Sequence, residues 1–343
     1  MLAIIRQIGR VTGIALLALL MLGMSTWGTL ALVYWDHAGA PLRCTLAGLF
    51  AGTTLLLMGA ARSARWRWRA WAAFLALFAL LLGSWSRIEA SNVRDWQPEN
   101  AVLAYASVEG ERITLHNIRN FAYRSENDFT PAYYDRSFDL GQLNAVDLFA
   151  VYWMGPSIAH VFLSFGFADD KHVAVSIETR RERGEEYSSV RGFFRQYELY
   201  YVVGDERDIV RLRSNYRHNP PEQVYLYRLR GDAASARALF LEYVREINAL
   251  NQQARWYNTL TTNCTTNIWL HARVNPGHVP WSWKILASGH VPEYLYEQGL
   301  IDTSIPFAEL QRRAHINARA QAADQDEDFS QRIRAAPLAA QIH

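Results

Sequence analysis

Three apolar runs in the first quarter of the chain limit its architecture more than any other feature. They cover about residues 11–35, 43–61 and 70–86. The first is long enough to cross a bilayer core of roughly 30 Å, and the third can be extended at both ends. We therefore predict three transmembrane helices and assign residues 1–90 to a membrane anchor. A cleaved signal peptide is the alternative interpretation of the first run, but that run exceeds a typical signal-peptide core and two more follow it.

The arginines around these runs predict their orientation. Cytoplasmic loops carry an excess of Arg and Lys, whereas the loop between the first two runs contains Asp36 and His37. We expect the N-terminus and the loop at 62–69 to be cytoplasmic. The rest of the chain should then lie in the periplasm of a bacterial inner membrane, as part of a multi-pass protein. The arginines that decide this are Arg6, Arg10, Arg62, Arg65, Arg67 and Arg69.

Residues 91–316 have the pattern of one α+β domain. Short runs of β-branched and aromatic residues predict strands, and Asp232 is typical of the cap of a helix whose apolar positions recur at helical spacing. A second helix is predicted at 265–272, and residues 317–343 are predicted to be a polar, flexible tail. The predicted strands cover 101–106, 112–116, 137–140, 145–153, 158–167, 172–178, 198–203, 209–213 and 224–229. The apolar helix positions are Leu239, Phe240, Tyr243, Val244, Ile247 and Leu250.

The strands at 158–167 and 172–178 form a predicted β-hairpin with two different faces. One face is apolar, with Val161 and Leu163, and should lie on the core. The other is small and polar, and it carries His160 and Ser176. A loop with an odd number of residues puts Glu178 opposite His160, whereas a two-residue loop puts Thr179 there.

Cys264 is the only cysteine outside the apolar first third of the chain. In an oxidising compartment an unpaired cysteine is either buried and inert or kept as a thiol for chemistry. Its neighbours are Thr and Asn, which favours the second interpretation. At the first turn of a helix, free N–H groups should lower the thiol pKa and bind an oxyanion. Asn263, Thr265 and Ser164 are the predicted supporting residues.

The predicted chemistry is that of a Cys/His pair. Cys264 is the candidate nucleophile, His160 the candidate general base, and either Glu178 or Ser176 the group that orients the imidazole. Each residue alone has a structural explanation, because a strand histidine or a lone cysteine is more often part of a core.

Other site classes are disfavoured. The ten histidines lack HExxH spacing and there is no CxxC, so no metal and no cofactor are predicted. A net charge of +2 does not predict a nucleic-acid partner. The charge runs at 178–183 and 205–208 are expected to be solvated faces, or alternatively contacts to an anionic headgroup. Arg180 and Tyr257 are the candidate substrate or headgroup contacts.

The stretch 137–299 resembles the periplasmic domain of Lnb-type lipoprotein N-acyltransferases. The resemblance rests on the segments 158–167, 175–182, 205–208 and 256–266, in this order. The order of His before Cys also resembles permuted papain-like (NlpC-type) folds. The resemblance implies that Cys264 is the nucleophile and His160 the base of an acyltransferase. The membrane spans precede the domain here, whereas they follow it in the Lnb type, which leaves the substrate open.

These observations favour a membrane-anchored, cysteine-dependent acyltransferase at the periplasmic face of the membrane. Its expected partners are a membrane phospholipid and the N-terminus of a lipoprotein, and it would work through an acyl-thioester on Cys264. Hydrolysis of the acyl group is equally compatible with the residues. A papain-like peptidase or amidase acting on cell-wall peptides is the alternative enzyme, and a non-catalytic envelope scaffold or binding protein is the alternative outside enzymes.

Overall fold

The computed structural model describes residues 2–35 and 39–335, and the chain divides into two compact units. One unit holds residues 1–90 together with 188–196. The other holds residues 91–187 and 197–343. Each unit is described separately below.

The first unit contains three helices that are long and apolar enough to cross a membrane. They are α1 (Leu2–Val33), α2 (Ala40–Ala60) and α3 (Arg67–Ser86). The helices pack closely, since a Cβ at Gly28 would lie 2.7 Å from Leu81 and from Phe50. The guanidinium of Arg195, in the segment 188–196, donates to the carbonyls of Trp85 and Ser86 at the end of α3. The three predicted apolar helices are thus present.

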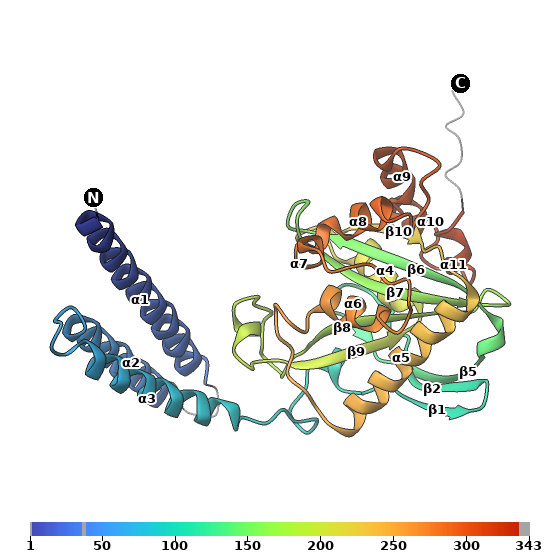
Figure 1. Ribbon diagram of the computed structural model, residues 1–343. Coiled ribbons are helices and arrows are strands. Elements are labelled where there is room, and N and C mark those ends of the chain that lie inside the picture. Colours follow the sequence, from blue (N-terminus) through green and yellow to red (C-terminus); the bar gives the residue numbers. More distant parts are fainter. Residues whose placement is uncertain (1, 36–38, 336–343) are drawn as a thin grey trace. The chain divides into compact units, whose positions relative to one another are not determined.

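An eight-stranded, almost wholly antiparallel sheet forms the centre of the second unit (Figure 1). Its order is β1-β2-β9-β8-β7-β6-β10, and β5 pairs with β2. The strands are β1 (Tyr105–Glu109), β2 (Arg112–Arg119), β5 (Tyr133–Asp139), β6 (Leu143–Tyr152), β7 (Ala159–Phe167), β8 (His172–Arg180), β9 (Glu198–Gly204) and β10 (Gln223–Arg228). A separate pair joins β3 (Ala122–Tyr123) and β4 (Phe129–Thr130). The unit therefore has the predicted α+β class.

Helices α5 (Ala233–Gln252) and α6 (Cys264–Ala272) cover one face of this sheet (Figure 1). The Asp232 side chain caps α5 by accepting from the backbone N–H of Ser235 at 2.6 Å. All six apolar positions predicted for this helix are buried. They pack on the odd-numbered residues of β7, such as Leu163 and Phe165, so the hydrophobic core lies between α5 and the sheet. Helices α7 (Trp283–Leu286), α8 (Val291–Glu297) and α9 (Phe307–Ala314) follow in the chain.

The opposite sheet face is also buried, which corrects the expectation of a small, polar face. Phe162 and Ala174 lie on it at 0% exposure, within a second apolar cluster. Residues 209–213, predicted as a strand, form the end of α4 (Glu206–Arg211) and the start of η4 (Leu212–Tyr216) and contribute to this cluster. A short apolar run does not distinguish a strand from a buried helix, and here the helix packs on the sheet.

Residues 317–335 are ordered helices, so the prediction of a flexible tail is wrong for this stretch. Helices α10 (Asn317–Ala322) and α11 (Phe329–Arg332) pack on the second face, where Ala320 and Phe329 are fully buried. The remaining predicted tail, 336–343, lies outside the described residues. Residues 317–335 are polar on average, but their few apolar side chains recur at helical spacing and pack on the second sheet face.

The charge run 205–208 is another correction, because two of its members are buried ion-pair partners rather than a solvated face. Glu206 and Asp208 are 0% exposed. Arg334 binds Glu206 at 2.6 Å and Asp147 at 2.8 Å, so the end of the described chain is joined to the sheet by a buried cation. Arg119 binds Asp208 at 2.8 Å.

Candidate active site

The candidate site lies where the sheet opens between β7 and β8. The ladder between these strands pairs Leu163 with Val175 and continues to Gly166 with His172, but it does not extend toward Ala159. Beyond Leu163, β7 pairs only with β6, and β8 pairs only with β9. The two strands therefore separate from Phe162 back to the start of β7. This gap includes His160.

Four side chains form a chain of polar contacts beside this gap. His160 Nε2 lies 2.7 Å from Ser176 Oγ, and Ser176 donates to Glu178 Oε1 at 2.8 Å. Glu178 Oε1 also accepts from Arg213 Nη2 at 2.7 Å and lies 3.6 Å from His160 Nε2. The paired register matches the odd-numbered loop, which is the case that brings Glu178 level with His160. Both candidates for the orienting group are thus present, Ser176 in direct contact and Glu178 through it.

These contacts determine which imidazole nitrogen is free. The single hydroxyl hydrogen of Ser176 is directed to Glu178, so Ser176 Oγ accepts from His160 and Nε2 carries the proton. In the neutral imidazole Nδ1 is then an unprotonated acceptor. This leaves Nδ1 as the atom of His160 that can take a proton.

Cys264 enters the same gap from the α6 side of the sheet. It is the first residue of α6, is half-buried, and packs against the core cluster that includes Val161. The N–H of Phe167 donates to the carbonyl of Lys171, on the β8 side. Every second N–H of a strand points the same way, so the N–H groups of residues 161, 163, 165 and 167 all face β8. The N–H of Val161 therefore points toward β8, into the gap, on the side where it can lower the pKa of the Cys264 thiol.

In the part of the chain that the structure describes, the link between thiol and imidazole runs through Glu178, whose charge raises the Cys264 pKa and which is joined to His160 by Ser176. No hydrogen bond joins the thiol and the imidazole of these described residues directly. His160 and Val161 are consecutive residues of β7. The same strand therefore carries the imidazole and the N–H that lowers the thiol pKa. A missing direct bond does not disqualify such a pair, since catalytic hydrogen bonds are often long before substrate binds.

The start of β7 is fixed by a close backbone approach. Ser288 accepts from the N–H of Ala159 at 3.0 Å, and Gly289 donates to the carbonyl of Ser157 at 3.0 Å. A Cβ at Gly289 would lie 2.1 Å from the Pro156 carbonyl oxygen, so only glycine fits there. This contact sets the position of β7 directly before His160.

The ionisation of the pair differs from the sequence expectation. Burial raises the pKa of the Cys264 thiol, and the charge of Glu178 adds to this, although N–H groups of Val161 and Thr265 oppose it. Burial also lowers the pKa of His160 to about 3, aided by Arg213. The helix N-terminus therefore does not produce a lowered thiol pKa here. At neutral pH the site holds a thiol and a neutral imidazole.

Glu178 has the opposite behaviour. Burial alone would raise the pKa of its carboxyl, but the positive charge of Arg213 overrides burial and holds the pKa well below its usual range. Glu178 is therefore a carboxylate at neutral pH, placed one hydroxyl away from the imidazole. A carboxylate in this position can stabilise an imidazolium that forms during a reaction.

The side chains of the three predicted supporting residues make hydrogen bonds that stabilise the fold. Asn263 caps α6 by accepting from the Thr266 N–H at 2.8 Å, and Thr265 donates to the Ile285 carbonyl at 2.6 Å. Ser164 donates to Glu206 at 2.6 Å on the second sheet face. The oxyanion donors that the structure offers are backbone groups instead, namely the N–H groups of Val161 and Thr265 at the sulfur.

Arg180 and Tyr257 are also placed differently from the headgroup contacts expected. Arg180 is 2% exposed and donates to the Asn100 and Ala101 carbonyls, each at 2.9 Å. Its guanidinium stacks on Trp96, which makes it part of the core rather than of a lipid-facing surface. Tyr257 is buried, and its pKa is raised by burial and by the nearby Cys264. It therefore lies close to the thiol.

Arg213 is the residue that sequence reasoning missed. It was assigned to a strand, whereas η4 turns its guanidinium toward Glu178 and, at 3.5 Å, toward Glu222. Arg217 binds Glu222 at 2.9 Å and extends this group of charges. Arg217 follows η4 in an extended conformation, so the four-residue spacing of the two arginines does not mark a helix face, and no local pattern of the sequence indicates this group. No three His, Cys, Asp or Glu side chains of residues 2–35 and 39–335 are placed to hold a metal.

The pH dependence of thiol alkylation tests the ionisation of this site. We expect the rate of Cys264 alkylation by iodoacetamide to rise about tenfold per pH unit from pH ~6 to ~8.5, because only the thiolate reacts and its fraction is small below a raised pKa. The measurement uses the Cys44→Ala protein, in which Cys264 is the only cysteine. A rate that stays flat between pH ~5 and ~7 would instead indicate a preformed thiolate–imidazolium pair.

One known family model matches part of the chain. The family model of the Lnb N-terminal periplasmic domain matches residues 129–289, a span that includes His160, Ser176, Glu178 and Cys264. No curated protein and no solved structure matches the chain. Three helices apolar and long enough to cross a membrane thus accompany a domain of a periplasmic family. Over residues 129–289, the chain is similar to the Lnb N-terminal periplasmic domain family.

Proposed function

We propose that the protein is a membrane-anchored cysteine acyltransferase that forms an acyl-thioester on Cys264. The observation that carries this proposal is the position of the Cys264 sulfur in the gap between β7 and β8, next to the His160–Ser176–Glu178 chain. The family match supports a periplasmic location for the domain. A permuted papain-like arrangement, in which the histidine precedes the cysteine, is part of the same proposal.

In the first half-reaction the Cys264 sulfur attacks the carbonyl carbon of a phospholipid acyl ester. Because thiol and imidazole are both neutral at rest, His160 Nδ1 accepts the thiol proton as the carbon–sulfur bond forms. The carbonyl electron pair moves to oxygen, which backbone N–H groups such as that of Val161 can bind. The carbon–oxygen bond then breaks, and the imidazolium returns its proton to the departing lysophospholipid alkoxide.

In the second half-reaction an acceptor amine attacks the thioester carbonyl carbon. His160 Nδ1 takes a proton from the amine, the carbon–sulfur bond breaks, and the proton passes to the Cys264 sulfur. The products are an amide and the starting thiol. During both steps the Glu178 carboxylate, acting through Ser176, stabilises the transient imidazolium. The acceptor proposed is the N-terminal amine of a lipoprotein.

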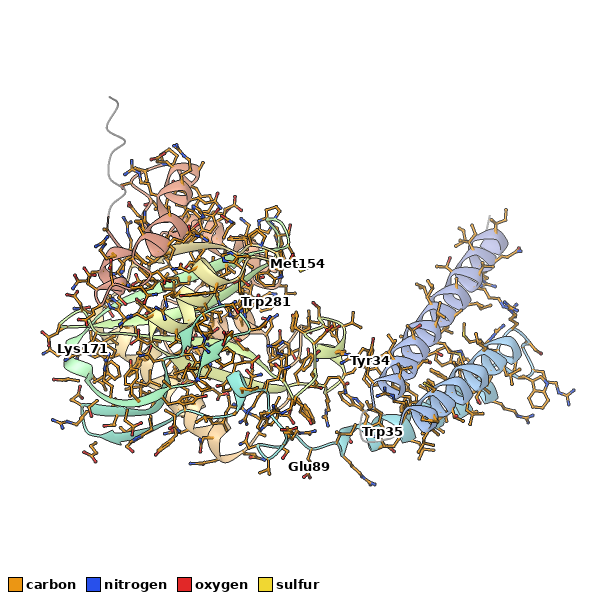
Figure 2. The ribbon with its side chains drawn as sticks, turned by 180° about the vertical axis from the view of Figure 1, so that it is seen from behind. Tyr34, Trp35, Glu89, Met154, Lys171 and Trp281 are labelled. Carbon is orange, nitrogen blue, oxygen red and sulfur yellow. The ribbon has the colours of Figure 1, made fainter. Side chains whose placement is uncertain are left out.

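Exposed aromatic and apolar side chains near α6 support a lipid substrate. Trp281 and Trp283 are 51% and 61% exposed, and Met154 is 68% exposed. Trp281 and Met154 are both at the surface of the second unit (Figure 2). Trp281 packs on Trp269 of α6, the helix that begins at Cys264. Indole rings favour the headgroup region of a bilayer.

Intact-protein mass spectrometry tests the proposal. After incubation with phospholipid vesicles, the purified protein should gain the mass of one acyl chain, and neutral hydroxylamine should remove it, as expected for a thioester. Cys44→Ala should behave like the wild type, whereas Cys264→Ala should gain no acyl mass. Equal labelling of wild type and Cys264→Ala would contradict the proposal. Release of peptides from purified peptidoglycan, without acyl mass, would indicate a peptidase instead.

A further inference from the structure

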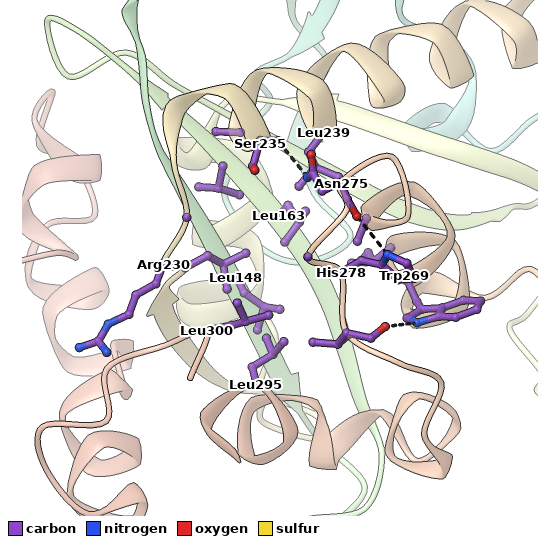
Figure 3. Close-up of a pocket in the computed structure, with 18 of the residues that line it drawn as sticks. Leu148, Leu163, Arg230, Ser235, Leu239, Trp269, Asn275, His278, Leu295 and Leu300 are labelled. Carbon is purple, nitrogen blue, oxygen red and sulfur yellow. Dashed lines mark hydrogen bonds between the residues drawn. The ribbon is translucent and has the colours of Figure 1, made fainter. Parts of the chain in front are cut away.

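A largely apolar cavity of about 390 Å³ lies in the second unit, between the sheet and the helices that follow it (Figure 3). This volume is in the range of sites that hold small molecules. The wall is formed by strands β6 and β7, by α5 and α6, and by α8. Its leucines are Leu148, Leu163, Leu229, Leu239, Leu295 and Leu300.

One end of the cavity adjoins the candidate nucleophile. Val161, whose N–H lowers the pKa of the Cys264 thiol, lines the cavity, and so does Thr265, the residue after Cys264. Ile268 lines it too, four residues after Cys264 and therefore on the same side of α6. Both Cys264 and Ile268 pack against the same core cluster. Cys264 itself is not one of the lining residues, so the cavity begins beside it, at Val161 and Thr265.

The cavity continues along α6 away from Cys264. The lining residues of this helix run from Thr265 through Ile268 and Trp269 to Ala272. From Cys264 to Ala272 the helix rises about 12 Å, so the cavity is elongated along it. At the far end the lining becomes polar, with Asn275 and His278, while the charged end of Arg230 points away from the leucines (Figure 3).

We infer that this cavity holds the alkyl chain of the acyl group while its carbonyl carbon is bonded to Cys264. The inference rests on the proposed function and specifies its substrate as a linear acyl chain. An apolar space that begins beside Cys264, at Thr265, and runs along α6 to Ala272 fits a chain whose reactive carbon is at one end. The leucine wall offers nothing to a polar peptide, which is the substrate of the alternative enzyme.

Acylation of the full-length protein by activated esters of different chain length tests the inference. The protein is placed in nanodiscs of diether phospholipid, which contain no acyl ester, and is treated with the p-nitrophenyl esters of butyryl, octanoyl and dodecanoyl groups. Acylation of Cys264 releases p-nitrophenolate. We expect kcat/KM to rise about fourfold for each further methylene that enters the cavity.

Two tryptophan variants on one helix make the test specific. Ala236 lines the cavity from α5, whereas Ala234 is exposed and does not line it. Ala236→Trp should remove most of the preference for octanoyl over butyryl. Ala234→Trp should behave like the wild type. Ala272→Phe, which fills the cavity from α6, replaces Ala236→Trp as the blocking variant if that protein does not fold.

The outcomes separate this inference from the proposed function. If the butyryl ester acylates Cys264 but longer chains do not raise kcat/KM, the cavity does not hold the chain. The assignment of Cys264 as the nucleophile would then remain supported. If chain length matters but neither Ala236→Trp nor Ala272→Phe changes the preference, the chain binds elsewhere and the inference is overturned. If no ester acylates Cys264, the proposed function fails and the inference fails with it.

Discussion

His160→Ala is expected to slow formation of the Cys264 acyl-thioester by ~10²–10⁴-fold, because the proposed mechanism passes the thiol proton to this imidazole. The effect should be large here, since the thiol pKa is raised and little thiolate forms without a base. The measurement is the initial rate of p-nitrophenolate release from the butyryl ester. The rate for the variant should recover steeply as the pH is raised, because hydroxide then supplies the thiolate.

His116→Ala is the matched control for this prediction. His116 is also a strand histidine paired with a carboxylate, since its Nδ1 lies 2.7 Å from Asp135, but it lies on β2 and its partner is exposed. Its removal should leave the acylation rate unchanged. If His160→Ala and His116→Ala have the same rate, and both unfold at the wild-type temperature, His160 is not the base.

Arg334→Ala is expected to lower the free energy of unfolding by about 3–5 kcal/mol, because it removes one partner of a buried ion group. Burial would raise the pKa of Glu206, but Arg334 overrides it and lowers that pKa to about 2. Without the guanidinium, Glu206 keeps only the Ser164 hydroxyl, while Asp147 still has Arg228 at 2.5 Å. The Tm of the purified protein should fall by roughly 10 °C.

Arg332→Ala provides the comparison for this variant. Arg332 lies two residues earlier, pairs with Asp326 at 3.2 Å, and is 51% exposed. An exposed ion pair contributes about 0–1 kcal/mol, so its loss should barely move the Tm. Equal Tm values for the two variants would show that the buried group does not hold the end of the chain in place.

The sequence was sufficient where a periodic pattern extended over many residues. The six apolar positions of α5 and the Asp232 cap are as predicted, and so is the hairpin of β7 and β8. Alternation along the hairpin also placed His160 and Ser176 on one face. These features depend on local geometry, which neighbouring residues determine.

The parts that could not be predicted depend on long-range packing. The pKa of Cys264 follows from its burial and from Glu178, neither of which is visible in the residues around it. Arg213 reaches Glu178 only because α4 and η4 pack on the sheet. The helices within 317–335 have a polar average composition. Their few buried residues, such as Phe329, are buried only because a distant sheet face packs against them, which the local sequence does not show.

The direction of the Val161 N–H, which points into the gap between β7 and β8, limits how far this site can vary. Because successive N–H groups of β7 point to opposite neighbours, moving the donor by one residue would turn it toward β6 and away from the sulfur. The alternation of the strand therefore requires the donor N–H to belong to the residue directly after His160. The donor is also oriented before any substrate arrives, since the strand itself holds it. Reorganisation of this group during the reaction should therefore be small.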